Sequence, residues 1–211
     1  ISRRNLALRG EESFAKVMDM AEYARREINE IGGYYAYGKE LVNGTSVYDY
    51  DVTKLSVHTL GLGLAGIEVY DLLRDEYDIQ IEFGDIGNIM AYISIGDRLQ
   101  DIERLVGALA DIARIYKKDS TGMLSGEFIS PIVARSPQEA FYSAKESMPV
   151  EKTEGRISGE FVMCYPPGIP ILAPGEMITD EIIQYILYVK EKGCSMQGTE
   201  DKSVNKLKVL V

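Results

Sequence analysis

One glycine motif in the chain could bind a nucleotide. Residues 61–66 read GLGLAG and match the G-x-G-x-x-G pattern of dinucleotide-binding turns. Such glycines let the backbone approach a pyrophosphate at the N-terminus of a helix. The strand expected before the motif carries Lys54, Ser56 and His58, however, whereas a central parallel strand is almost entirely apolar. We therefore interpret residues 61–66 as a glycine-rich turn between a strand and a helix, with a dinucleotide-binding module as the alternative.

Few other side chains have a type and a spacing that indicate catalysis or metal binding. His58 is the only histidine, so we assign it no role and expect no metal site. Cys164 and Cys194 do not suggest a disulfide framework and are expected to be free thiols in a reducing compartment. From spacing alone, Glu82 is expected on a solvated strand face. Glu176 follows a Pro-Gly turn and is expected to make local hydrogen bonds.

The composition bounds the class of protein and its partners. The 211 residues are 45% hydrophobic and 27% charged, as in an ordinary globular protein of one large or two small domains. The formal net charge of −10 argues against a nucleic-acid partner and against an anionic membrane surface. No apolar run reaches the roughly 18 residues of a membrane span. The chain has no basic-then-apolar leader, so secretion is not indicated. It opens without an initiator methionine and already in helical register, as expected of a sequence that begins within a longer protein.

Hydrophobic spacing predicts an α+β first domain over residues 1–118. The expected order is a helix at 11–31, strands at 34–37 and 53–59, a helix at 66–77, strands at 79–82 and 89–95, and a helix that Asp97 caps together with Gln100. Glycines in the turn 84–88 suit a tight antiparallel return. We therefore expect a small antiparallel sheet covered by helices.

A second domain, predicted as a C-terminal α/β extension, is expected over residues 119–211 after a polar boundary at 119–126. Ser136-Pro137-Gln138-Glu139 predicts a helix start, and Thr179 is expected to cap a helix that runs through Lys192. Leu207, Val209 and Val211 indicate a last strand.

The segment 164–176, CYPPGIPILAPGE, contains four of the seven prolines in the chain. Because proline fixes φ and lacks an N–H donor, we expect an extended strap that is neither a helix nor a central strand. The strap is interpreted as a packed connection or as a support for a binding site or a subunit contact. Five tyrosines between residues 34 and 50 suit a subunit contact or a core edge equally well.

The strap and its neighbours resemble one known family. Residues 165–170 (YPPGIP) and 174–179 (PGEMIT) resemble the C-terminal signature of the ornithine/lysine/arginine decarboxylases, which are pyridoxal-phosphate (PLP) enzymes of fold type I. Four shorter segments of the chain agree with the same family: SPQEAF at 136–141, with Gln138 where an arginine is expected, GRIS at 155–158, ISIGD at 93–97 and GTED at 198–201. The resemblance covers essentially the whole chain and implies the small domain and the C-terminal domain of such an enzyme.

One feature of the family is missing. Its PLP Schiff-base lysine lies in a Ser-x-His-Lys setting within an N-terminal domain, whereas the only histidine here, His58, is followed by Thr59. The resemblance therefore implies the C-terminal part of a decarboxylase, with no catalytic and no cofactor-binding residue in this chain and with PLP held by the missing domain. We expect the chain alone to be inactive. A non-catalytic interaction or assembly protein of the same fold is the alternative.

The resemblance also implies roles for individual residues. Glu82 is similar in position to the family's partner for the distal ammonium or guanidinium of the substrate. Arg156 could hold a carboxylate or form a structural ion pair. Glu176 and Tyr165 are expected to anchor the strap, with a direct part in the substrate-binding site as the alternative. The implied setting is a cytoplasmic homodimer in polyamine or acid-stress metabolism that acts on lysine, arginine or ornithine, which the sequence does not separate.

Overall fold

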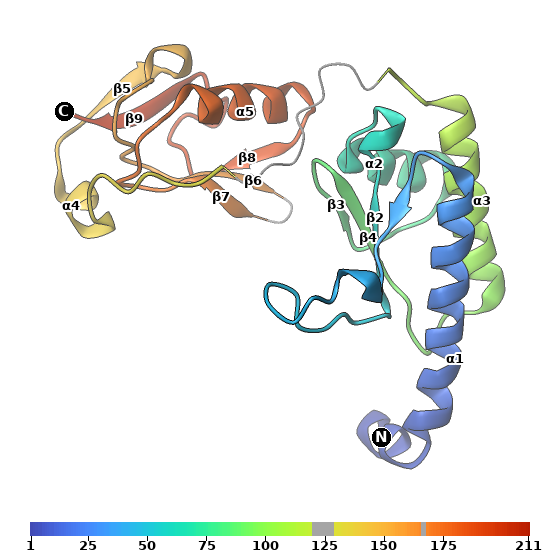
Figure 1. Ribbon diagram of the computed structural model, residues 1–211. Helices are drawn as coiled ribbons and strands as arrows, with labels where there is room; N and C mark the ends of the chain where they lie inside the picture. Colours follow the sequence, from blue (N-terminus) through green and yellow to red (C-terminus); the bar gives the residue numbers. More distant parts are fainter. Residues whose placement is uncertain (120–128, 166–167) are drawn as a thin grey trace. The chain divides into compact units, whose positions relative to one another are not determined.

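The computed structural model describes residues 1–119, 129–165 and 168–211 (Figure 1). Contacts divide the chain into two compact units, Ile1–Met123 and Leu124–Val211. The predicted boundary stretch lies outside the described residues from residue 120 onward, as do Pro166 and Pro167 of the strap. The placement of a domain boundary after residue 118 stays a prediction.

Over residues 1–119, the first unit is a four-stranded antiparallel sheet with three helices. Its elements are α1 (Ser2–Ile31), β1 (Tyr35–Ala36), a 3-10 turn (Lys39–Leu41), β2 (Lys54–His58), a 3-10 turn (Leu60–Leu62), α2 (Gly66–Tyr77), β3 (Phe83–Gly84), β4 (Asn88–Tyr92) and α3 (Leu99–Ile115). The strand order is β1-β2-β4-β3, and every neighbouring pair is antiparallel. This order of elements confirms the predicted antiparallel layer with helices.

The core of the first unit lies between the sheet and the helices. Leu55 and Val57 of β2 and Ile89 and Ala91 of β4 are buried in one cluster with residues of α1, α2 and α3. Residues between them, such as Ser56, are only half-buried. The alternation gives the sheet one face toward the helices and an opposite face that is more accessible.

The strand predicted at residues 79–82 is wrong, because β3 begins only at Phe83. Asp78 ends α2 in the left-handed conformation with φ 52°, and the Ile79 N–H still donates to Leu73 O at 2.9 Å. The chain is therefore tied to the helix end before it can pair with a strand. Ile81 is buried although it lies in a turn. Because polar residues flank it, the sequence alternates between apolar and polar residues as it does in a strand.

Asp97 does not cap α3, which corrects a second expectation. Its carboxylate accepts the Ser94 N–H at 2.6 Å and closes the preceding turn, while Arg98 stands at the N-cap position. The Asp101 carboxylate then accepts the Arg98 N–H at 3.0 Å. The ends of two predicted strands are also wrong: β4 stops before Ile95, which is 57% exposed, and β9 (Lys206–Leu210) stops before Val211.

The motif at residues 61–66 begins within the 3-10 turn and ends at the first residue of α2. The strand before it, β2, is antiparallel to both of its neighbours, whereas a dinucleotide fold needs a parallel crossover. A Cβ at Gly66 would lie 1.9 Å from Asn88 O, so this glycine allows α2 to approach the β3–β4 turn. The geometry favours the interpretation as a glycine-rich turn.

Within the described residues, the second unit holds two small antiparallel sheets and two helices. Its elements are α4 (Pro137–Tyr142), β5 (Lys145–Pro149), a 3-10 turn (Val150–Lys152), β6 (Val162–Tyr165), β7 (Ile169–Leu172), α5 (Asp180–Glu191), β8 (Ser195–Gln197) and β9 (Figure 1). The sheets have the orders β5-β9 and β7-β6-β8. The predicted caps are confirmed, since Ser136 Oγ accepts the Glu139 N–H at 3.2 Å and Thr179 Oγ1 accepts the Ile182 N–H at 3.3 Å.

The proline strap is extended, as predicted, in the part that the structure describes. Its residues Ile169–Leu172 form the edge strand β7 beside β6, and an edge position is where a strand can hold Pro170. The expectation that the strap avoids a central strand is wrong for Cys164 and Tyr165, which end β6, the central strand of that sheet. Leu172 is fully buried, and the strap ends at Gly175, whose carbonyl accepts the N–H groups of Ala134 and Arg135 at 2.9 Å. The strap therefore joins the second core to the segment before α4.

Arg25 of α1 is a buried cation in the first unit, with only 5% of its surface exposed. Its guanidinium donates to Tyr37 O at 2.5 Å, to Val52 O at 3.1 Å and to the Glu22 carboxylate at 3.2 Å. The guanidinium carbon also lies 5.4 Å from the centroid of the Tyr50 ring. Arg25 thus ties both ends of the segment 37–52 to the helix.

Replacing Arg25 with methionine is expected to lower the free energy of unfolding by about 3 kcal/mol, because the carbonyls of Tyr37 and Val52 both lose their donor. The neighbouring Arg26 is a matched control, since 66% of its side chain is exposed. Arg26→Met should change the same quantity by less than about 0.5 kcal/mol. Urea unfolding monitored by circular dichroism measures both, and equal effects would contradict the role given to Arg25.

Candidate functional site

Glu82 lies at the bend between α2 and β3, with an exposed side chain. Its N–H donates to Met90 O at 3.0 Å, which fixes its backbone beside β4. The preceding residue, Ile81, is buried in the core. Because β3 is an edge strand, the Glu82 carboxylate stands at an open edge of the sheet, where a ligand or another domain can reach it.

Arg156 lies in the second unit and is half-buried. Its Nη2 donates to the Glu146 carboxylate at 2.7 Å and to Leu210 O at 2.7 Å. These contacts join β5 and β9 to the segment that follows the 3-10 turn. The geometry favours a structural ion pair over the holding of a ligand carboxylate.

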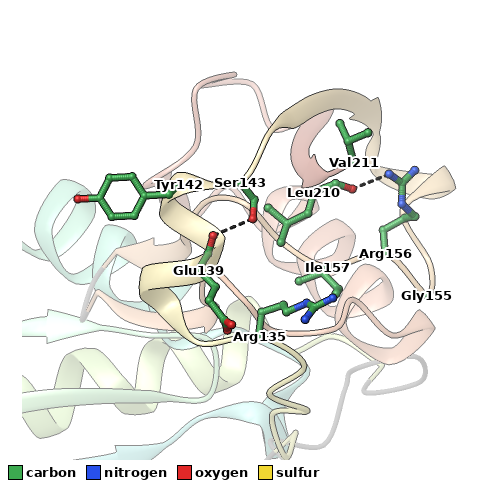
Figure 2. Close-up of a pocket in the computed structure, with 9 residues that line it drawn as sticks. All are labelled: Arg135, Glu139, Tyr142, Ser143, Gly155, Arg156, Ile157, Leu210 and Val211. Atoms are coloured by element: carbon green, nitrogen blue, oxygen red, sulfur yellow. Dashed lines mark hydrogen bonds between the residues drawn. The ribbon is translucent and has the colours of Figure 1, made fainter.

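A cavity of about 560 Å³ lies beside Arg156 (Figure 2). Arg135 and Glu139 also line it, and Ser143 Oγ donates to Glu139 O at 2.7 Å. The N–H of Ser136 first, and its hydroxyl second, hold the pKa of the Glu139 carboxyl below its usual range, with a smaller contribution from the Arg135 charge. Arg135 is not among the site residues predicted from the sequence, where its only signal is its place directly before the capping Ser136.

Glu176 is half-buried at the end of the strap. Its carboxylate accepts the Ala173 N–H at 2.8 Å, and its carbonyl accepts the Ser158 N–H at 2.8 Å. The segments of Glu176 and Arg156 are neighbours, because the Ile178 N–H donates to Arg156 O at 2.8 Å. Glu176 therefore stabilises the turn that closes the strap. Tyr165, at the end of β6, is 52% exposed.

The lysines of this chain do not fit a covalent PLP site. Every lysine lies in the described residues, and each is exposed or half-exposed. Several are already paired: the Nζ of Lys118 lies 2.6 Å from the Glu68 carboxylate, and that of Lys190 donates to Asn205 at 2.6 Å. A Schiff-base lysine needs a desolvated position beside a phosphate cradle, so no step through PLP is assigned to these residues.

In the part of the chain that the structure describes, none of the helices is both long and apolar enough to cross a membrane. No group of three or more histidine, cysteine, aspartate or glutamate side chains there is placed to hold a metal ion.

Comparisons with known proteins show which proteins the chain is similar to. Residues 125–202 match the family model described as Orn/Lys/Arg decarboxylase, C-terminal domain. The chain is 37% identical to the arginine decarboxylase of Bacillus subtilis over an alignment 213 positions long that covers 100% of this chain and 44% of that protein. It is 38% identical to that of Halalkalibacterium halodurans, over 99% of this chain and 43% of the relative. Against the constitutive lysine decarboxylase of Escherichia coli it is 30% identical over 49% of this chain and 15% of the relative.

Solved structures agree on the fold. The lysine decarboxylase of Francisella novicida matches with a TM-score of 0.64 and 18% identity over 96% of this chain and 40% of its own. The constitutive lysine decarboxylase of Escherichia coli matches with a TM-score of 0.65 and 17% identity over 96% of this chain and 41% of its own.

These proteins define a class, the basic amino-acid decarboxylases, whose C-terminal α+β architecture this chain shares. The chain belongs to the Orn/Lys/Arg decarboxylase family and corresponds to the C-terminal part of its longer members. It spans less than half the length of the curated relatives named above.

Proposed function

We propose that the chain supplies the small domain and the C-terminal domain of a PLP-dependent decarboxylase of a basic amino acid, with arginine as the first substrate to test. The observation that carries the proposal is similarity along the whole chain to two proteins named arginine decarboxylase, at 37–38% identity. Similarity to the lysine decarboxylase covers only about half of the chain, so lysine ranks second.

The chain's own residues contribute recognition and support in this proposal. When PLP is bound in the longer protein, it takes up the electrons released as the carboxylate leaves. Glu82 receives the distal guanidinium or ammonium group at the open sheet edge, where a charge-assisted hydrogen bond favours a basic substrate. Arg156 and Glu176 hold the segments around the strap in place.

The remaining parts of the proposal concern partners and setting. The Schiff-base lysine comes from a separate N-terminal domain, and the active enzyme is a cytoplasmic homodimer that feeds polyamine metabolism. The family resemblance and the match of less than half of each relative support the missing domain. The net charge of −10 supports a cationic substrate over an anionic one.

The proposal predicts that the 211-residue chain alone releases no CO₂ from arginine, lysine or ornithine in the presence of PLP. It also predicts that the chain shows no internal-aldimine absorbance, because no lysine is placed to form the Schiff base. A chimera tests whether this chain supports decarboxylation when a PLP-binding domain is present. In the chimera, this chain replaces the corresponding part of the Bacillus subtilis arginine decarboxylase. We expect the chimera to release CO₂ from arginine.

Two results would contradict the proposal. Aldimine absorbance in the chain alone would show that it holds PLP. A folded chimera that binds PLP yet decarboxylates none of the three amino acids would favour the non-catalytic assembly protein. The control is a chimera whose Schiff-base lysine is replaced by alanine, which must be inactive.

A further inference from the structure

A second cavity, of about 570 Å³, lies in the second unit beside the end of α5. Lys190 of α5 and Ser195 of β8 line it, together with Lys202 and Ser203 of the turn before β9. Because β8 is an outer strand of the sheet β7-β6-β8, the cavity lies at one edge of that sheet. Groups from a helix, a strand and a turn therefore meet around one space.

The turn before β9 is held in an unusual conformation at this cavity. Val204 is buried and has φ 48°, a value that a β-branched residue rarely adopts. The Asp201 carbonyl accepts the Val204 N–H at 2.8 Å. The Asp201 carboxylate accepts the N–H groups of Ser203, at 3.0 Å, and of Asn205, at 2.9 Å. The turn is therefore ordered before any ligand arrives, which lowers the cost of binding.

Lys190 brings an ammonium group to the cavity in a fixed position. Its Nζ donates to Asn205 Oδ1 at 2.6 Å and to Val204 O at 3.4 Å. Both acceptors are neutral, and an ammonium group has three protons, so one donor remains for a ligand. The N–H of Ser203 first, and the Lys190 charge last, hold the pKa of the Asp201 carboxyl below its usual range. Asp201 does not line the cavity itself.

The charge that lines the cavity is positive, although the whole chain has a formal net charge of −10. Lys202 adds a second, exposed ammonium group, and Ser195 and Ser203 add hydroxyl donors. No aspartate or glutamate is among the described residues that line the cavity. The two acidic residues of the turn are already bound, since Glu200 forms an ion pair with a lysine of β9 at 3.3 Å and Asp201 accepts the N–H groups of the turn.

We propose that this cavity binds a phosphate group, either as free phosphate or as the phosphate of a small ester. Lysine ammonium groups bind phosphate as point charges, and hydroxyl groups can donate to its oxygens. Met196 and Val204 line the cavity as well, and its volume is within the range of sites for small organic ligands. We therefore expect the organic part of an ester to add affinity. The proposal goes beyond decarboxylation and uses none of the residues given a role in it.

The test is a titration of the 211-residue chain, followed by ¹H–¹⁵N NMR, with inorganic phosphate, glycerol 3-phosphate and neutral glycerol. Sodium chloride keeps the ionic strength constant, so that general screening does not change between samples. We expect saturable shifts from both phosphates, concentrated at Ser195, Lys202 and Ser203, and no saturation by glycerol. The lower of the two Kd values tells whether free phosphate or an ester is the better ligand.

Variants separate this site from general attraction to lysine. Lys202→Gln removes one charge at an exposed position, and we expect Kd for the better phosphate to rise about tenfold. The matched control is Lys152→Gln, which removes an exposed lysine of the same unit that does not line the cavity and should leave Kd unchanged. The spectrum of each variant checks that it is folded.

Four results would overturn the proposal: no saturable shift from either phosphate, shifts spread over the whole surface, an unchanged Kd in Lys202→Gln, or equal weakening by Lys152→Gln. Because no catalysis is measured, each of them leaves the proposed decarboxylation untouched.

Discussion

Replacing Glu82 with glutamine raises KM for arginine about 10- to 100-fold in the active chimera, if Glu82 binds the distal guanidinium. Glutamine keeps the shape and loses the charge, and a hydrogen bond to a charged group contributes about 1.5–3 kcal/mol. The bend itself should survive, because it is fixed by the Glu82 N–H and by buried Ile81, not by the carboxylate. Steady-state kinetics on arginine measures the change.

The matched control is Glu103→Gln, which removes another exposed carboxylate from the first unit. It should leave KM unchanged within experimental error, because Glu103 lies on α3 and has no assigned contact with the substrate. If Glu82→Gln leaves KM for arginine at the level of this control, the role given to Glu82 is lost while the family relationship stands.

Replacing Gly66 with alanine is expected to destabilise the first unit by at least about 3 kcal/mol, as severe core overpacking does. A Cβ at this position would lie 1.9 Å from Asn88 O and 2.7 Å from Asp85 O, and these are backbone atoms that no side-chain rotation can move away. Gly84 of β3 packs against the same start of α2, since a Cβ added at Gly84 would lie 2.5 Å from Gly66 O. Helix and turn must separate to admit the methyl group.

Gly107→Ala is the control for this prediction. Gly107 lies inside α3, and a Cβ there would meet nothing within 4 Å. Alanine should therefore stabilise the helix by about 0.5–1 kcal/mol. Urea unfolding of both variants checks the sign as well as the size, and a Gly66→Ala chain as stable as the parent would show that α2 does not pack against the β3–β4 turn in this way.

The order of the first unit could be predicted because hydrophobic periodicity is strong there. α2 begins and ends at the predicted residues, Gly66 and Tyr77. β3 could not be placed, because buried Ile81 lies in a turn and produces the alternation of a strand. Asp97 and Asp101 are chemically equivalent candidates for a helix start, and the closure of the Ser94 turn decides between them.

The family could be predicted from the strap, since its prolines and glycines form a long and specific pattern. The cavities could not be predicted from the sequence. Arg135 and Arg156 are separated by 20 intervening residues, and Lys190 and Lys202 line one cavity only because the end of α5 and the turn before β9 lie beside each other. From the sequence, Asp85 could be recognised only as a turn residue. One of its carboxylate oxygens accepts the N–H groups of Gly87 and Asn88 in that turn.

We propose that this chain acts as the C-terminal part of a decarboxylase of basic amino acids. The most direct test is the release of CO₂ from carboxyl-labelled arginine, lysine and ornithine by the intact product of the native gene, with its length measured by mass spectrometry. We expect a product more than twice as long as this chain that releases CO₂ from one of the three, with arginine first. A product no longer than this chain, or a longer one that binds PLP and decarboxylates none of them, would contradict it.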